Sequence, residues 1–205
     1  EKQIHAMVRL AAKRGAKQIY MHAFLDGRDT PPQSASQYIK NIEVVFNELG
    51  VGRISDIMGR FYVMDRDNRW ERVKAAYEML TLGKAERTAT SALAGLEKAY
   101  EIGENDEFVK PTTIHAAGES PVTINDGDSV IFMNYRADRA REITHAFNDA
   151  DFDHFQREKI PALSHYVALT QYDKSFTVPI AFPPEEITNT LGEYIAANHL
   201  TQLRI

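Results

Sequence analysis

The sequence predicts an α/β domain in which a mixed β-sheet is flanked by helices. Apolar residues alternate between helical spacing and short strand-like runs. Glycines follow several helical segments at the position of a C-terminal cap. The region 108–134 contains short apolar runs between turns, which predicts an antiparallel part of the sheet. Because we find no repeat and no Gly/Ser linker, we expect a single domain over residues 1–205.

The first half of the chain predicts two buried strands and four helices. The strands are expected at 19–25, a largely apolar run that predicts a buried strand, and at 53–58. Each helix shows apolar residues three or four positions apart and a glycine after its last turn. The four apolar faces are Ile4, Met7, Val8 and Ala11; Ile39, Ile42, Val45, Phe46 and Leu49; Trp70, Val73, Tyr77 and Leu80; and Leu93, Leu96 and Tyr100.

The second half predicts further strands and two helices. One helix is expected from about 137 to 148, with its apolar face turned inward. A last helix is expected to open at Pro183, because proline is tolerated in a first turn. Its apolar face would be Ile187, Leu191, Tyr194 and Ile195. The strands are expected at 108–114, 121–124, 129–134 and 165–170.

Composition excludes several classes of function. The net charge of −5 and the pI of about 5.8 argue against a nucleic-acid partner, which usually meets a broad basic face. The absence of cysteine excludes disulfides, thiolate metal sites and cysteine nucleophiles. No apolar run approaches the roughly 18 residues of a membrane span, so we expect a cytoplasmic protein. No His, Asp or Glu pattern has metal-ligand spacing.

Arginines gather in three short clusters after predicted strands. The clusters are Gly27-Arg28-Asp29, the run from Gly59-Arg60 to Arg69, and Asn134 to Arg139. The loops that leave the carboxyl ends of strands converge on one rim, where α/β domains bind ligands. The guanidinium fork matches carboxylate and phosphate groups with two parallel hydrogen bonds. The clusters therefore predict a site for a small organic anion.

The residues of each cluster allow a functional and a structural interpretation. Arg28 and Asp29 could form a surface pair worth about 0–1 kcal/mol. Gly59 could admit a ligand close to the backbone beside Arg60. Acids and bases alternate over residues 65–69, so some of them must pair with each other. Arg136 and Arg139 are three residues apart, which would place them on one face at a helix N-terminus suited to phosphate.

Four strings of residues resemble the family of cofactor-independent (2,3-bisphosphoglycerate-independent) phosphoglycerate mutases. Their order and spacing match as well, and the resemblance covers essentially the whole chain. The strings are His22 to Asp29; Gly59 to Tyr62 with Met64 to Asp67; Asn105 to Val109; and Asn134 to Ala140.

The resemblance implies that residues 1–205 are a substrate-binding (transferase) domain inserted into an alkaline-phosphatase-like domain. That second domain would carry two Mn²⁺ ions and a phosphoryl-accepting serine, so no cofactor and no metal are expected in this chain. The full-length protein would be a monomeric isomerase that interconverts 2- and 3-phosphoglycerate in glycolysis. This chain alone would be inactive, with phosphoglycerate and the phosphatase-like domain as its partners.

The resemblance also implies roles for individual residues. Asp29 would bind the hydroxyl groups of the substrate and serve as the catalytic general acid and base. The carboxylate and phosphate of the substrate would be held by Arg28, Arg60, Arg66, Arg136 and Arg139.

A stand-alone, non-catalytic binding module for a phosphorylated metabolite is the alternative. The chain begins without Met and stops in Gln202-Leu203-Arg204-Ile205, which resembles the start of a strand. These ends favour a fragment of a longer enzyme.

Overall fold

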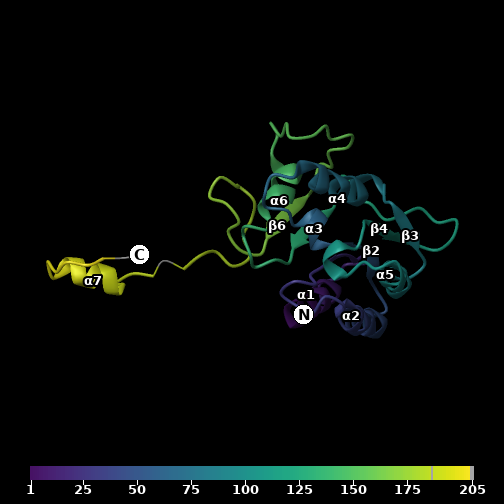
Figure 1. The fold of residues 1–205 in the computed structure, drawn as a ribbon, viewed down its shortest axis with the longest axis horizontal. Coiled ribbons are helices and arrows are strands. Elements are labelled where there is room, and N and C mark those ends of the chain that lie inside the picture. Colours follow the sequence, from purple (N-terminus) through teal and green to yellow (C-terminus); the bar gives the residue numbers. More distant parts are fainter. Residues whose placement is uncertain (186, 204–205) are drawn as a thin grey trace.

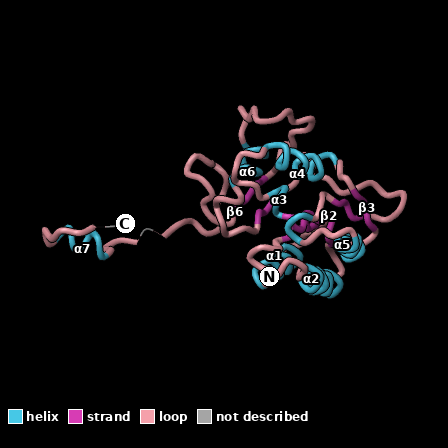
Figure 2. The backbone as a smooth tube through the Cα atoms, viewed as in Figure 1, coloured by secondary structure: helices cyan, strands magenta, loops and turns pink. Residues whose placement is uncertain are grey.

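A computed structural model describes residues 1–185 and 187–203, and its centre is a four-stranded mixed sheet (Figures 1 and 2). The strand order is β1-β2-β4-β3. β1 and β2 are parallel, β2 and β4 are antiparallel, and β3 and β4 are parallel. The predicted α/β class with a mixed sheet is therefore confirmed. The strands span Tyr20–Leu25 (β1), Arg53–Gly59 (β2), Arg87–Ala89 (β3) and Thr112–Ile114 (β4).

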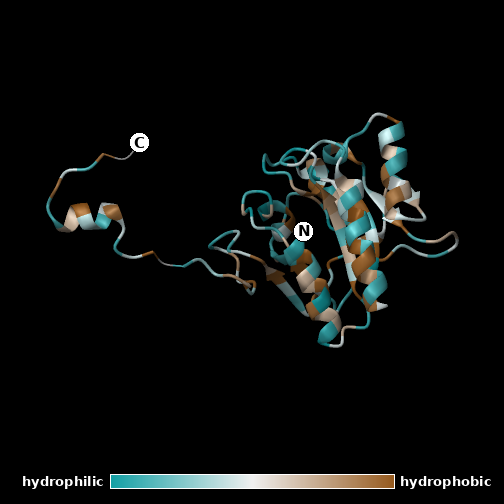
Figure 3. Cartoon of the chain, turned by 90° about the horizontal axis from the view of Figure 1, so that it is seen from below, coloured by the Kyte–Doolittle hydropathy of each residue, from teal (hydrophilic) through white to brown (hydrophobic). Residues whose placement is uncertain are grey.

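Helices α1 (Lys2–Lys13), α2 (Ala35–Leu49) and α5 (Ala92–Glu101) bury their apolar faces against this sheet. In Figure 3, apolar and polar residues lie on different sides of the long helices, as the predicted spacing requires. Gly50 ends α2 with a left-handed φ of 63°, a conformation that glycine adopts without steric cost. The shared core includes Val8, Ala23, Leu25, Ile39, Phe46, Ile57 and Leu96.

A second buried cluster lies among α3 (Arg60–Val63), α4 (Trp70–Leu82), α6 (Arg141–Asn148) and a small parallel sheet. That sheet consists of β5 (Ser129–Phe132) and β6 (His165–Ala168). The run at 129–134 was expected in the main sheet, and this expectation is wrong. The rings of Phe24 on β1 and Phe132 on β5 meet edge to face with centroids 5.9 Å apart. This contact aligns the end of β5 with the end of β1.

Two predicted strands between 108 and 134 are wrong in part or in full. Residues 108–114 form a strand only at β4, because Asp106–Phe108 is a 3₁₀ turn (η1) and Pro111 has no N–H for a ladder. Residues 121–124 form no strand, and the Ile124 N–H donates to a carbonyl at the end of α4. Strand β3 was not predicted, since three residues show no clear apolar pattern.

The predicted starts of the last two helices are also wrong. Residues 137–140 form a turn, and α6 begins only at Arg141. Helix α7 spans Leu191–Ala197, because the side chains of Thr190 and Glu193 form a capping box there. Glu186 of the predicted helix start lies outside the described residues, as do Arg204 and Ile205 of the predicted final strand.

Helix α7 lies at the end of an extended arm, away from the body of the molecule (Figures 1 and 3). The face predicted to be apolar is exposed there, at 78% for Ile187 and 75% for Leu191. Among the described residues, no helix has the length and apolar character that a membrane span requires.

Candidate functional site

The three arginine clusters meet at one rim of the fold. Because β1 and β2 are parallel with Leu25 opposite Gly59, the loops that follow them leave the sheet side by side. The loop after β5 joins them through the ring contact between β5 and β1. Ion pairs connect the loops: Asp29 lies 2.9 Å from Arg60 and 3.3 Å from Arg136. The predicted convergence of the clusters is confirmed.

The loop after β1 is organised by Asp26, which the sequence analysis did not single out. Its Oδ1 accepts the backbone N–H groups of Arg28 (3.1 Å) and Asp29 (3.0 Å). This is the turn that an Asp side chain forms with the backbone two and three residues later. The same oxygen accepts a hydrogen bond from Arg60 Nη1 at 2.6 Å. Asp26 therefore fixes both the position of Asp29 and that of its partner.

The η1 turn sets the spacing between the loops after β1 and β2. A Cβ atom at Gly27 would lie 2.6 Å from the backbone nitrogen of Glu107, and one at Gly59 would lie 2.0 Å from its carbonyl oxygen. Gly59 was expected to admit a ligand, but the backbone of Glu107 occupies that space. Asp106 ties η1 to α2, because its Oδ2 accepts N–H groups from Ser34 (2.9 Å) and Ala35 (3.0 Å).

Arg60 is the buried centre of the rim network. It is 3% exposed, and its Nη1 donates to Asp26 and Asp29. A second bridge passes through Asp138, whose Oδ2 accepts from Arg136 (3.0 Å) and Arg66 (2.9 Å). Four ion pairs between loops thus join the three loops into one network: Arg60–Asp26, Arg60–Asp29, Arg136–Asp29 and Arg66–Asp138.

Arg139 lies beside this network and not on a shared helical face with Arg136. Both residues precede α6, so the predicted helical arrangement of the two is wrong. The turn directs Arg139 Nη1 to the carbonyl of Met64 at 2.9 Å. Arg136 instead reaches Asp29 and Asp138.

The carboxylates of the network are held in their charged form. Hydrogen bonds and positive charge from Arg60, followed by Arg136, hold the pKa of Asp29 below its ordinary value. Hydrogen bonding to Arg136 holds the pKa of Asp138 well below its ordinary value. Burial and the positive charge of neighbouring arginines lower the pKa of Arg139. Asp29 is thus a carboxylate at neutral pH.

Three buried donors at the rim lack an acceptor among residues 1–185 and 187–203. They are Arg60 Nε, Arg139 Nε and Asn134 Nδ2. The amide orientation of Asn134 follows from its Oδ1, which accepts the backbone N–H of Arg136 at 3.2 Å. An unsatisfied buried donor costs about 1–3 kcal/mol, so an anion that reached these groups would recover part of that cost.

Arg28 is the predicted residue that the structure does not bring into the network. Its side chain is 64% exposed, and its Nη1 lies 3.4 Å from Glu107 Oε1. Sequence reasoning missed Asp26, Asp138 and Asn134 as site residues. All three stand in the same short strings as the arginines, so adjacency was the available signal.

Tyr172 holds the loop after β5 in place. Its hydroxyl lies 2.8 Å from the carbonyl oxygen of Phe132 and 2.7 Å from that of Asn134. Burial raises the pKa of Tyr172 to about 12, so the hydroxyl keeps its proton and donates to this turn. No local pattern indicates this contact, which joins residues 40 and 38 positions apart.

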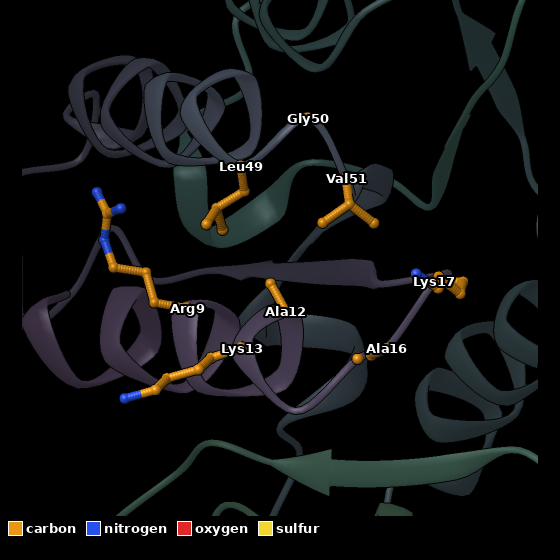
Figure 4. Close-up of a pocket in the computed structure, with 9 residues that line it drawn as sticks. Arg9, Ala12, Lys13, Ala16, Lys17, Leu49, Gly50 and Val51 are labelled. Atoms are coloured by element: carbon orange, nitrogen blue, oxygen red, sulfur yellow. The ribbon is translucent and has the colours of Figure 1, made fainter.

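A hollow of about 540 Å³ lies at the other end of the sheet, between the last turns of α1 and α2 (Figure 4). Lys17 and Val51 on its wall lie shortly before the first residues of β1 and β2, Tyr20 and Arg53. It therefore adjoins the amino ends of the strands that carry the arginine loops at their carboxyl ends. Its cationic lining residues are Arg9, Lys13 and Lys17.

No group of three or more His, Asp or Glu side chains is placed to hold a metal ion in the part of the chain that the structure describes. The rim network offers guanidinium donors beside its carboxylates, which suits an anion and not a cation.

Comparisons with known proteins agree with this geometry. A family described as "BPG-independent PGAM N-terminus" matches residues 1–174. The 2,3-bisphosphoglycerate-independent phosphoglycerate mutase of Yersinia pseudotuberculosis is 57% identical over the whole chain, and that of Pseudomonas aeruginosa is 56% identical. The chain spans 40% of the length of each.

A solved structure shows the same fold. The Leishmania mexicana phosphoglycerate mutase, crystallised at low cobalt concentration, superposes with a TM-score of 0.86 at 32% sequence identity. The match covers 97% of this chain and 38% of that one. The chain belongs to the family of 2,3-bisphosphoglycerate-independent phosphoglycerate mutases, within the N-terminal region that the family match describes.

Proposed function

We propose that this chain is the substrate-binding (transferase) domain of a phosphoglycerate mutase that interconverts 2- and 3-phosphoglycerate. The observation that carries the proposal is the rim network, in which buried Arg60 and half-buried Arg139 each retain a buried Nε donor that no described residue accepts. The named activity of the relatives supports it. The phosphoserine of the reaction would form on a part of the full-length protein outside this chain.

The substrate carries a carboxylate and a phosphate, and the network offers a separate guanidinium group to each. Hydrogen bonds to charged groups contribute about 1.5–3 kcal/mol each. Arg60, Arg66, Arg136 and Arg139 would bind these anions, and Arg28 would join them after leaving Glu107. Glycerate must stay bound while its phosphoryl group resides on the enzyme, and a fork of arginines on its carboxylate prevents its escape.

Asp29 would contact the hydroxyl groups and move their protons. In the ligand-free network its lowered pKa keeps it ionised, so it is free to accept a proton. Substrate anions would draw Arg60 and Arg136 away from Asp29 and add negative charge beside it. Both changes raise the pKa of Asp29, which lets it return the proton as an acid in the reverse half of the reaction.

The proposal assigns the remaining machinery to the phosphatase-like domain of the full-length enzyme. Two Mn²⁺ ions there would neutralise charge on the transferring phosphoryl group. The proposal also includes a monomer in the cytoplasm with no nucleic-acid or membrane partner. Light scattering at two protein concentrations tests the monomeric state.

The testing experiment is a titration of this chain with 3-phosphoglycerate, followed by amide chemical shifts. We expect saturable shifts in the loops around Asp29, Arg60 and Arg136. Glycerol 3-phosphate, which lacks the carboxylate, should bind more weakly by about tenfold or more. No shift at millimolar ligand would contradict a site organised within this chain.

A chimaera separates the mutase domain from the stand-alone binding module. In it, this chain replaces the matching 40% of the Pseudomonas aeruginosa enzyme. Turnover by the chimaera, with none by this chain alone, supports the proposal. A folded chimaera without turnover, together with tight binding by the chain, would favour the stand-alone module.

A further inference from the structure

Beneath the loop that carries Arg66 lie two buried carboxyl groups that hold neighbouring residues of that loop. Asp65 is 2% exposed and Glu142, in the first turn of α6, is 6% exposed. Both accept backbone N–H groups from the same turn, Asp65 from residues 67 and 69 and Glu142 from Asn68 between them, so each carboxyl group influences the ionisation of the other. Neither group belongs to the rim network or has a role in the proposed reaction.

The donors around this pair are unevenly shared. Asp65 Oδ2 accepts the N–H groups of Asp67 and Arg69, both at 2.9 Å, and its Oδ1 accepts Arg72 Nη1 at 3.1 Å. Glu142 Oε1 accepts only the N–H of Asn68, at 3.0 Å. Its Oε2 is buried and receives no N–H or O–H from the described part of the chain.

Two buried carboxylates held by consecutive residues would repel each other, so the site favours a proton on one of them. Asp65, with three donors, is stabilised as the carboxylate, so the proton belongs to Glu142. Burial, together with the negative charges of Asp65 and Asp67, raises the pKa of Glu142 to about 7 against the opposing Asn68 N–H. The charged groups that face the pair are thus Asp67 and Arg72.

The shape of the Arg66 loop depends on these contacts. Asn68 has a left-handed φ of 58°, a conformation that asparagine adopts more readily than other non-glycine residues. The Glu142 carboxyl holds this residue through its N–H. Asp65 holds the residues on either side of it.

We propose that Glu142, as a neutral carboxylic acid beside Asp65 that accepts the Asn68 N–H, is a positioning residue that holds residues 64–69 in the shape that places Arg66 in the rim network. The inference rests on the proposed function for its effect on ligand binding. Loss of the proton would leave two buried carboxylates held by consecutive residues. They would repel each other and release the loop.

The sign of the pH effect follows from the raised pKa. The neutral carboxyl is fully present below the ordinary range of a glutamate and is lost as pH rises through about 7. Glu142→Gln keeps an acceptor for Asn68 and carries no charge, so it should remove this pH dependence. Glu142→Ala removes that acceptor. Glu43→Gln is a matched control, since burial also raises the pKa of Glu43, which lies on α2.

The first measurement uses the chain without ligand. The Glu142 carboxyl carbon, assigned by its absence in Glu142→Gln, should titrate near neutrality, with the Asn68 and Arg69 amides shifting at the same midpoint. In Glu142→Gln these amide shifts should vanish, whereas Glu43→Gln should retain them. A Glu142 carboxyl that titrates in the ordinary glutamate range would overturn the inference, whether or not the chain binds phosphoglycerate.

The second measurement compares dissociation constants for 3-phosphoglycerate at each pH, which cancels titration of the ligand. Between about pH 6 and about pH 8.5, the wild-type Kd should rise about fivefold relative to Glu142→Gln. Glu142→Ala should bind weakly at both pH values. A constant ratio would overturn the inference. Absence of binding by every variant would contradict the proposed function instead and leave the shift titration to decide the role of Glu142.

Discussion

Both ends of the main sheet carry cationic side chains, but these differ in burial and in their contacts. At the amino ends of β1 and β2, Arg9, Lys13 and Lys17 line an open hollow (Figure 4). At the carboxyl ends, Arg60 is 3% exposed and shares its donors among acids from a neighbouring loop. The hollow is open and its lysines form no ion pair among the described residues, whereas the rim is held together by a buried guanidinium group. Buried charge, rather than hollow volume, is therefore the feature on which the proposed rim site depends.

The largest effect is expected at Arg60. Arg60→Ala leaves Asp26 and Asp29 without their shared partner, which should lower the free energy of unfolding by about 2 kcal/mol, since both acids are partly exposed. Binding of 3-phosphoglycerate should be lost. Urea unfolding and the ligand titration measure both effects. Arg9→Ala, at the hollow, is the control and should change neither; equal losses for both variants would remove the contrast between the two ends.

Arg136 separates binding from stability. Its side chain is 48% exposed, so solvent screens its ion pairs and they should contribute little to stability. Arg136→Ala should weaken 3-phosphoglycerate binding about 100-fold, the loss of a charged bidentate contact. The Tm should stay within a few degrees, and turnover of the full-length enzyme should fall by orders of magnitude. A large drop in Tm would instead make Arg136 a structural residue.

Asp29 should affect turnover more than affinity. Asp29→Asn removes a carboxylate that competes with the ligand for Arg60 and Arg136. Affinity of the chain for 3-phosphoglycerate should change by only about threefold, in either direction. Turnover in the chimaera should fall by about 100-fold or more, since the amide accepts no proton. An unchanged turnover would exclude the acid–base role.

The smallest effect is expected in the hollow. Lys13→Ala and Lys17→Ala, made together, should leave Kd for 3-phosphoglycerate and Tm unchanged, because neither lysine takes part in an ion pair among the described residues. Binding that weakens with this variant would show that the hollow, and not the rim, receives the anion.

Local patterns in the sequence predicted most of the elements. The spacing that predicts α2 and α4 spans three to four turns, and each ends at a left-handed glycine, Gly50 or Gly83. Strand ends followed by arginines predicted the rim, since parallel pairing of β1 and β2 brings their loops together. Where these signals are short, the predictions were wrong: β3 has only three residues, and α7 starts where a capping box forms.

Contacts between distant segments decided the rest. The turn before α6 is shaped by Arg139, whose acceptor, the carbonyl of Met64, lies 75 positions away. The path of the chain after β5 depends on the Tyr172 hydroxyl. No local sequence pattern predicts either of these two contacts. For the same reason Arg28, although it stands beside Asp29, turned out to face Glu107.

The η1 turn makes the spacing of the rim loops insensitive to many substitutions elsewhere in the protein. Gly27 and Gly59 both pack against the backbone of Asp106 and Glu107. Backbone contacts, rather than side chains, therefore set the distance between the loops that carry Asp29 and Arg60. Substitutions that change the size of core side chains can accumulate without altering this distance between the loops. The fold shared with the Leishmania mexicana enzyme, at a TM-score of 0.86 and 32% identity, is consistent with such tolerance. At the two glycines, by contrast, even one added methyl group would collide with the backbone and move the arginine loops apart.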